Sequence, residues 1–273
     1  MAARSYLYVP GDRPDRLDKA IARAGDALIA DLEDAVPAAR KDLALTTVVD
    51  WLQALPVEGP EVWVRIGAGA RAADELAAVG ASSRVTGVIV AKAELAGLHE
   101  ADAVLPAGVH VGALLETARG LLQLPEIAAH PRVRQVGLGE ADLAAELGIA
   151  PGELSVLGPV RAQAVIASAA AGISGPTGPV FLDVTDLDGL RASTLALKSS
   201  GFAARSAIHP NQVAVIEDVF TPTAEEVATA RATVQAWDAA DVGVALDERG
   251  RMIDEAVVRL ARRVVQTADR LGL

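Results

Sequence analysis

Short apolar runs recur along the chain as far as residue 209, and they limit the possible folds more than any other feature. They are rich in β-branched residues and nearly continuous in apolar side chains, which is typical of strands buried on both faces. Helix-like segments separate them, such as 13–24, 74–80 and 186–201. The predicted strands are SYLYV (5–9), ALIAD (27–31), VWVRI (62–66), GVIVA (87–91), VHVGALL (109–115), RQVGL (134–138), PVFLD (179–183) and RSAIH (205–209).

Strands that alternate with helices in this way predict an α/β fold, a parallel (β/α)₈ TIM barrel. An open, doubly wound sheet is the alternative, and it is disfavoured because no glycine-rich dinucleotide-binding motif follows the first strand. The length of 273 residues suits one large barrel or two ordinary domains. In the helix predicted over 186–201, Asp186 or Asp188 is expected to cap the start and Gly201 to mark the end.

The alternation of strands and helices stops near residue 220, which predicts a barrel over 1–220 and a helical and hairpin extension over 221–273. Thr223, followed three residues later by Glu226, predicts a capping box at the start of a helix. A hairpin is expected to turn near Arg249-Gly250, and an amphipathic helix follows over 255–271. Its predicted apolar face consists of Val257, Ala261, Val264, Ala268 and Leu271. The extension is too small to fold alone, so it is expected to pack on the barrel or on a neighbouring subunit.

Composition excludes several classes of function. Apolar residues make up 51% of the chain and can fill a sizeable core, while the net charge of −11 argues against a nucleic-acid-binding groove. There is no cysteine, hence no disulfide or thiolate metal site, which suits a reducing cytoplasm. The N-terminal apolar run is too short for a signal peptide, and no apolar stretch is long enough to cross a membrane.

Polar residues follow the predicted strands, at the face where TIM barrels place their active sites. In ALIADLEDAV (27–36), three carboxylates crowd the end of one strand, which costs free energy unless a cation or a proton offsets their repulsion. A rim of this kind suits a hard divalent cation and an anionic substrate, with Arg65 as a bidentate clamp for a carboxylate. The rim residues are Asp31, Glu33, Asp34, Arg65, Lys92, Glu116, Glu140, Asp142, Asp183 and His209.

Each of these residues also has a structural interpretation. A strand-end acid can cap a helix or form half of an ion pair, and Asp34 can simply begin the turn to the next helix. His209, which precedes Pro210, can orient the last loop. Lys92 can be a Schiff-base lysine, as in class I aldolases, but the surrounding carboxylates favour an ion-paired ammonium.

Ordered motifs over residues 4–260 resemble the citrate lyase β subunit family of the HpcH/HpaI aldolase superfamily, which also contains malyl-CoA and citramalyl-CoA lyases. The motifs are RSYLYVPGDRPDRLDKA, ALIADLEDAV, VWVRI, ALLETARG, GEADLAAELG, AIHPNQ, FTPTAEEV and GRMID. The resemblance implies a (β/α)₈ barrel. It also implies Mg²⁺-dependent cleavage or formation of a β-hydroxyacyl-CoA thioester from acetyl-CoA and a 2-oxo acid.

The resemblance also assigns roles to residues. It implies Glu116 and Asp142 as metal ligands and Arg65 as the group that holds the oxo-acid carboxylate. Glu33 and Asp34 are implied near the metal's waters and the substrate, as catalytic residues with Arg65. Asp254 is implied to enter a neighbour's active site as the acid or base, within a closed ring such as a homotrimer. Gly139, the glycine of the G-x-x-D-L motif, and Arg13, near the CoA phosphates, complete the expected substrate-binding set.

The sequence also departs from the family pattern. Gly67, Ala204 and Arg205 stand where the family often has Asn, Gly and Lys, and Ala256 replaces a common proline. These changes leave open whether the substrate is a citryl-, malyl- or citramalyl-type thioester. Two other functions also stay open: a metal-dependent pyruvate aldolase acting on free acids, and a non-catalytic subunit or binding protein.

Overall fold

The computed structural model describes residues 3–56, 58–240, 244–246 and 250–273. The chain divides into two compact units, Met1–Glu217 and Asp218–Leu273. No helix in the described residues has both the length and the apolar character needed to cross a membrane.

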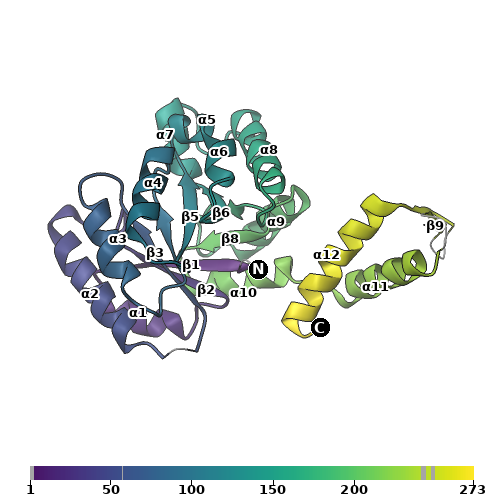
Figure 1. Cartoon of the computed structure of the whole chain (residues 1–273), viewed down its shortest axis with the longest axis horizontal. Coiled ribbons are helices and arrows are strands. Elements are labelled where there is room, and N and C mark those ends of the chain that lie inside the picture. The colour runs from purple at the N-terminus through teal and green to yellow at the C-terminus, as the bar shows by residue number, and fades with distance from the viewer. Residues whose placement is uncertain (1–2, 57, 241–243, 247–249) are drawn as a thin grey trace. The chain divides into compact units, whose positions relative to one another are not determined.

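The larger unit is a closed barrel of eight parallel strands, in which β1 pairs with β2 on one side and with β8 on the other. This confirms the predicted (β/α)₈ barrel, and Figure 1 shows the helices arranged around the strands. The strands are β1 (Ser5–Pro10), β2 (Ala27–Asp31), β3 (Glu61–Ile66), β4 (Gly87–Val90), β5 (His110–Leu115), β6 (Val133–Leu138), β7 (Thr177–Gly178) and β8 (Ala204–Ala207).

One or two α-helices follow each strand of the barrel. They are α1 (Pro14–Ile21), α2 (Lys41–Ala54), α3 (Ala72–Gly80), α4 (Leu95–Val104), α5 (Ala118–Leu122), α6 (Leu124–Ala128), α7 (Glu140–Leu147), α8 (Leu154–Ala170), α9 (Leu187–Ser199) and α10 (Pro210–Phe220). A short 3₁₀ helix, Ala38–Arg40, precedes α2. Asp186 caps α9 by accepting a hydrogen bond from the Gly189 N–H, and Gly201 follows the helix with a φ of 98°, both as predicted.

Large side chains fill the interior of the barrel. Tyr6 and Trp63 meet edge to face with their ring centroids 6.1 Å apart, and Ile29 and Ile89 pack beside them. Gly87 lies against the indole, and a Cβ there would approach Trp63 Cζ3 to 2.4 Å. The ring can therefore occupy the centre of the barrel only because this strand position has no side chain.

The seventh strand differs from its prediction. The apolar run 179–183 was expected to be the strand, whereas β7 consists of Thr177 and Gly178 and ends before Pro179. Proline has no N–H to continue a sheet ladder, so the run leaves the sheet at this residue. Asp183 consequently lies in a loop rather than at a strand end.

The smaller unit contains α11 (Ala224–Asp238) packed on α12 (Glu255–Leu271). The predicted capping box is present, since the Glu226 N–H donates to Thr223 Oγ1 at 3.1 Å and the Thr223 N–H donates to Glu226 Oε2 at 2.8 Å. The strands β9 (Ala245–Leu246) and β10 (Met252–Ile253) pair antiparallel, as a hairpin requires. Of the expected turn, residues 247–249 lie outside the described residues.

The apolar face of α12 differs from the prediction at its first position. Val257 is 40% exposed, whereas Val258 is buried against Ala245 and Ile253. The hairpin contributes these two partners, so tertiary packing decided which of the adjacent valines is buried. Ala261 and Ala268 are buried as predicted.

Candidate functional site

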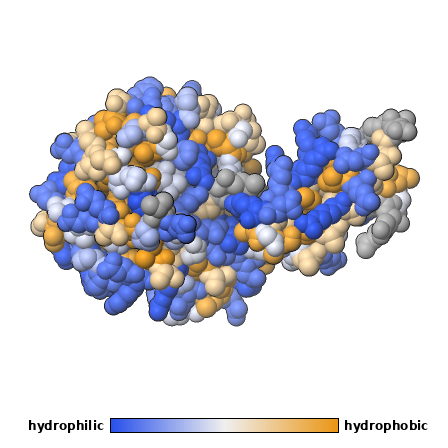
Figure 2. Space-filling model, turned by 60° about the horizontal axis from the view of Figure 1, so that its bottom comes forward, coloured by the Kyte–Doolittle hydropathy of each residue, from blue (hydrophilic) through white to orange (hydrophobic). Residues whose placement is uncertain are grey.

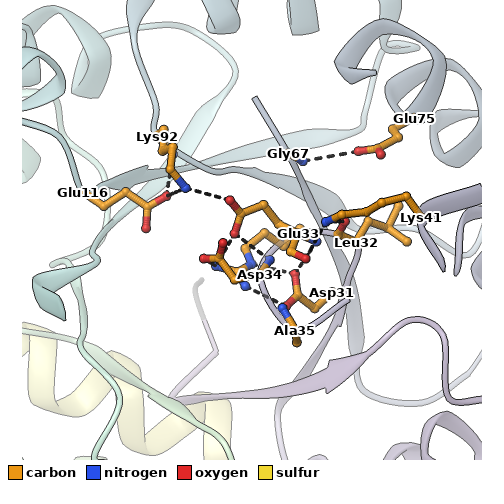
Figure 3. Close-up of polar contacts among 11 residues, drawn as sticks. Asp31, Leu32, Glu33, Asp34, Ala35, Lys41, Gly67, Glu75, Lys92 and Glu116 are labelled. Carbon is orange, nitrogen blue, oxygen red and sulfur yellow. Dashed lines mark hydrogen bonds and ion pairs between the residues drawn. The ribbon is translucent and has the colours of Figure 1, made fainter. Parts of the chain in front are cut away.

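The turn after β2 is held by hydrogen bonds from several directions. Asp31 is buried, and its two carboxylate oxygens accept from the Glu33 N–H at 2.8 Å and the Ala35 N–H at 3.1 Å. The Lys41 ammonium donates to the carbonyl oxygens of Leu32 and Glu33 at 2.7 and 2.6 Å (Figure 3). The crowded acids therefore lie on a rigid turn, and Lys41 is a contributor that the sequence analysis did not single out.

Arg65 is already engaged on one edge. It is the register partner of Asp31 on the neighbouring strand, and its Nε and Nη2 donate to the Asp31 carboxylate at 2.7 and 2.6 Å. Its Nη1 lies 3.1 Å from Glu33 Oε2 and 3.4 Å from Asp34 Oδ2. The expected bidentate clamp is thus closed on Asp31, and the Nη1 side is the part of the guanidinium that faces the other rim acids. The pairing follows from strand register, because in-register residues of parallel strands point the same way.

Lys92 joins two acids at the end of β4. It is the one non-glycine residue with a positive φ, 49°, in the described part of the chain. Its N–H donates to Glu116 Oε1 at 2.7 Å, and its ammonium donates to Glu33 Oε1 at 2.7 Å (Figure 3). The ion-pair interpretation of Lys92 therefore describes this structure, and the left-handed backbone directs the N–H at Glu116. Strained conformations of this kind are concentrated at functional sites.

Glu116 and Gly139 meet at the ends of β5 and β6, where Leu115 and Leu138 are in register. A Cβ on Gly139 would lie 2.5 Å from Glu116 Oε2 and 2.6 Å from Glu116 Cβ, so only glycine fits there. Glu116 is buried, whereas Asp142, in the first turn of α7, is exposed. Both acids line a cavity of about 510 Å³, together with Gly139, Asp34 and Arg65.

Burial and neighbouring charges shift the acid strengths in this cluster. Burial raises the pKa of Glu116 to about 7, even though the Lys92 N–H and ammonium act in the opposite direction. Burial also opposes ionisation of Glu33, but contacts with Asp34, Lys92 and Arg65 outweigh it and lower its pKa. The contact with Glu33, with burial, raises the pKa of Asp34 to about 6. The site thus holds one firmly ionised carboxylate beside two that retain a proton more readily.

The remaining side of the cavity is mostly apolar. Val180 and Leu182 follow β7, and Ile208 follows β8, and all three line the same cavity as the acids. Glu140 lies at this side too, where Arg161 of α8 holds both of its oxygens at 2.6 and 2.7 Å. The cavity therefore combines a charged side with an apolar side.

Several predicted site residues lie elsewhere. Asp183 accepts hydrogen bonds from Thr185 and Asp186 in its own loop, and His209 Nδ1 accepts from the Asn211 N–H. Neither is among the residues that line the cavity. Glu33 and Lys92 are not among them either, but each contacts a residue that is, Arg65 and Glu116 respectively. Arg13 also lies outside that lining and is 3.5 Å from Asp15.

Asp254 belongs to the smaller unit, where it caps α12 by accepting from the Val257 N–H at 3.0 Å. This is the geometry expected of a helix cap.

The structure also places two of the residues that depart from the family pattern. Ala204 is packed in the barrel interior and is not among the residues that line the cavity. The Gly67 N–H donates to Glu75 Oε2 at 3.3 Å.

A barrel with acids, an arginine and a lysine around a cavity at the carboxyl ends of its strands belongs to the class of TIM-barrel enzymes that act on anionic substrates. The family model described as HpcH/HpaI aldolase/citrate lyase matches residues 4–210. The chain belongs to this family.

Curated relatives match over nearly the whole chain. A (3S)-malyl-CoA thioesterase of Cereibacter sphaeroides is 32% identical over 284 residues, which cover 98% of this chain and 95% of the relative. An L-malyl-CoA/beta-methylmalyl-CoA lyase of Rhodobacter capsulatus is 30% identical over 302 residues, covering 97% and 94%.

A solved structure shows the same fold. CitE from Mycobacterium tuberculosis, in complex with magnesium, acetoacetate and coenzyme A, is 33% identical and superposes with a TM-score of 0.82. The match covers 98% of each chain, so it includes the smaller unit as well as the barrel.

Proposed function

We propose that the protein is a Mg²⁺-dependent carbon–carbon lyase. It cleaves or forms a β-hydroxyacyl-CoA thioester, with acetyl-CoA and a 2-oxo acid as the other reactants. The observation that carries the proposal is that Glu116 and Asp142 line one cavity with Arg65. The relatives agree with this chemistry, since one is named as a lyase of malyl-CoA thioesters and CitE holds magnesium, acetoacetate and coenzyme A.

The proposed donor set for Mg²⁺ consists of two protein carboxylates. Among the residues that the structure describes, no cluster of three or more His, Cys, Asp or Glu is arranged to hold a metal, so the remaining ligands would be water and substrate oxygens. Two carboxylates that line one cavity, Glu116 and Asp142, suit an ion that keeps several positions for water and substrate oxygens. A nearby cation would favour the ionised form of the buried Glu116, whose pKa burial raises to about 7. When bound, Mg²⁺ supplies positive charge that stabilises the negative charge developing on substrate oxygens.

The chain's own residues supply binding and proton transfer. Arg65 binds the substrate carboxylate through Nη1, the nitrogen that lies 3.1 Å from Glu33 Oε2 and 3.4 Å from Asp34 Oδ2. Asp34 lines the cavity and, with a pKa raised to about 6, suits the transfer of the hydroxyl proton. In the cleavage direction the proton leaves the hydroxyl, and the carbon–carbon bond breaks to give a 2-oxo acid and the enolate of acetyl-CoA. An acid then protonates the enolate carbon. Arg13 is proposed to meet the CoA phosphates.

Asp254 of a neighbouring subunit is proposed to be that acid. Around it, Leu246, Met252 and Leu260 are 63%, 61% and 63% exposed, and hydrophobic residues are visible on the surface of this unit in Figure 2. Apolar side chains at such exposure suit an intersubunit contact. A head-to-tail contact of this kind must close into a ring or polymerise, and we propose a homotrimer. The extension over 221–273 then supplies Asp254 to the neighbour's barrel.

The absence of cysteine suits a cytoplasmic location, which we also propose.

Subunit exchange tests the shared site. Asp254→Ala and Glu116→Ala proteins, each inactive, are mixed under conditions that exchange subunits. Activity should return, because some interfaces then pair an intact barrel with an intact extension. If exchange is demonstrated and the mixture stays inactive, the site is not shared through Asp254.

Product analysis tests the reaction itself. Citryl-, malyl- and citramalyl-type thioesters and the corresponding free acids are incubated with the protein and Mg²⁺, and products are identified by mass spectrometry. Acetyl-CoA with a 2-oxo acid supports the lyase. Free CoA with the intact hydroxy acid supports the second candidate, a thioesterase, which the name of one relative favours. Conversion of free acids alone would indicate the aldolase, and no conversion would indicate a binding protein.

A further inference from the structure

The segment Pro179–Leu182 forms part of the cavity without belonging to the sheet. Pro179, Val180 and Leu182 line the cavity, yet β7 has already ended at Gly178. Two backbone oxygens of the segment are held by side chains instead. Arg205 Nε donates to the Pro179 oxygen at 3.0 Å, and Gln212 Nε2 donates to the Phe181 oxygen at 2.8 Å.

Gln212 ties this segment to the loop after β8. Its side chain is fully buried, and its Oε1 accepts from the Ile208 N–H at 2.9 Å while its Nε2 serves Phe181. An amide has one accepting and one donating end, so both bonds depend on glutamine at this position. Ile208 itself lines the cavity. One buried amide therefore sets the spacing of two segments on the apolar side of the cavity.

Arg205 ties the same segment to α9. Its side chain is 3% exposed, its Nη1 donates to Ser193 Oγ at 2.7 Å and Thr194 Oγ1 at 2.8 Å, and its guanidinium lies 5.5 Å from the centre of the Phe181 ring. In the described chain, its hydrogen-bond partners are neutral oxygens rather than carboxylates. Burying a guanidinium is costly unless its donors are satisfied, so the bonds to fixed oxygens are what allow it to lie behind the wall.

We propose that Arg205 and Gln212 are positioning residues that hold Pro179–Leu182 as the apolar wall of the substrate cavity. The wall receives an uncharged part of the acyl thioester, and in this respect the inference rests on the proposed function. Because side chains, and not a strand ladder, hold the segment, it can shift while the barrel stays folded. Loss of the hydrogen bonds from Arg205 and Gln212 should therefore weaken substrate binding and leave metal binding intact.

The test compares Gln212→Met, Gln212→Glu and Arg205→Lys with a control, Gln163→Met, at an exposed position of α8. Gln212→Met removes both bonds, whereas Gln212→Glu keeps the acceptor for the Ile208 N–H and removes the donor to Phe181. Arg205→Lys keeps the charge but cannot donate both to the Pro179 oxygen and to the hydroxyl oxygens of Ser193 and Thr194 in α9. Hydrogen exchange is followed in peptides covering 177–186 and 206–212. Steady-state kinetics give KM and kcat for the acyl-CoA substrate, and electron paramagnetic resonance gives the affinity for Mn²⁺.

Gln212→Met should accelerate exchange in both peptides and raise KM roughly tenfold, the effect of losing a well-made buried hydrogen bond. Both kcat and the Mn²⁺ affinity should change by less than about threefold. Gln212→Glu should raise KM similarly while the Ile208 amide still exchanges slowly, Arg205→Lys should show a smaller rise, and Gln163→Met should show none.

Unchanged exchange in Gln212→Met, or faster exchange without a rise in KM, would overturn the proposal. A parallel loss of Mn²⁺ affinity would also overturn it, because the two residues would then support the whole site. If Gln212→Met does not fold, Arg205→Lys provides the same comparison. If the unmodified protein converts no acyl-CoA, the proposed function fails, whereas the exchange data still decide whether these residues hold the wall.

Discussion

The two sides of the cavity are built in different ways. After β2 to β5, charged side chains contact one another directly, and each of Asp31, Arg65, Glu33, Lys92 and Glu116 is bonded to another member of the set. After β7 and β8, apolar side chains line the cavity, and buried polar residues hold their backbone from behind.

This difference separates two kinds of function. The charged side fixes where ionised groups stand, which matters for metal binding and for charge that develops in the transition state. The apolar side fixes the shape that a substrate must match, which matters for binding and specificity. Substitutions on the charged side should therefore lower kcat, and substitutions behind the apolar side should raise KM.

The largest expected effect comes from the proposed metal ligands. Glu116→Gln or Asp142→Asn should abolish high-affinity Mn²⁺ binding and lower kcat by at least ~10³, because the positive charge that stabilises the transition state is lost. The matched controls are Glu100→Gln and Asp188→Asn, at exposed positions of α4 and α9. Normal turnover of either ligand variant in excess chelator would show that metal binding by Glu116 and Asp142 is not needed for the reaction.

The second largest effect is expected from Asp254, the proposed acid, which lies outside the barrel. Asp254→Asn keeps the helix cap, because Asn caps as well as Asp, but it removes the acid. Its kcat should fall by roughly 10²–10⁴ with an unchanged melting temperature. Asp254→Ala should lose both the activity and the cap, with a cost of about 0.5–2 kcal/mol in unfolding free energy. If Asp254→Asn is fully active, the residue is a cap alone.

Arg65→Lys tests the proposed contact between the charged side and the substrate carboxylate. Lysine keeps the charge but cannot hold Asp31 in a bidentate grip while offering a second nitrogen to a carboxylate. The kcat/KM for the 2-oxo acid should fall roughly 10–100-fold, whereas acyl-CoA affinity measured by calorimetry should change little. An equal loss of both would show that Arg65 supports the CoA side as well.

The smallest effect is expected from the backbone at Lys92. Because φ is positive there, Lys92→Gly should be more stable than Lys92→Ala by about 0.5–1 kcal/mol, or roughly 1–3 °C in melting temperature. Both variants lack the ammonium, so their difference isolates the backbone. At Lys19, inside α1, the order should reverse, because alanine is the better helix former. If Lys92→Ala is as stable as Lys92→Gly, Lys92 carries no backbone strain.

Much of the fold could be predicted because it depends on local patterns. The strand prediction 27–31 coincides with β2, and the helix predicted over 255–271 coincides with α12. The prediction of the seventh strand was wrong because an apolar run with β propensity also suits a segment that lines a cavity outside the sheet. Pro179 was the signal that this run could not continue a strand ladder. The prediction that Val257 lies on the buried face was wrong because the hairpin packs on Val258 instead.

Part of the site could be predicted for a similar reason. Strand-end acids and the motif order pointed to Glu116, Asp142, Arg65 and the acidic turn, and these residues line or border one cavity. The grip of Asp31 on Arg65 was not predicted, although pairing the strand ends in register would have suggested it. Lys41, Arg161 and Gln212 were missed because their partners are backbone oxygens or side chains that no motif connects to them.

By itself, the sequence determined the class of fold, the family and the kinds of chemical group at the strand ends. Periodicity and motif order are properties of neighbouring residues, so they can be recognised without knowing the fold. Only the tertiary structure decided that Arg65 is held by Asp31, that Lys92 turns its N–H toward Glu116, and that Gln212 holds the apolar wall. These contacts join segments far apart in the chain, and they exist because barrel closure and strand register bring those segments within hydrogen-bond distance.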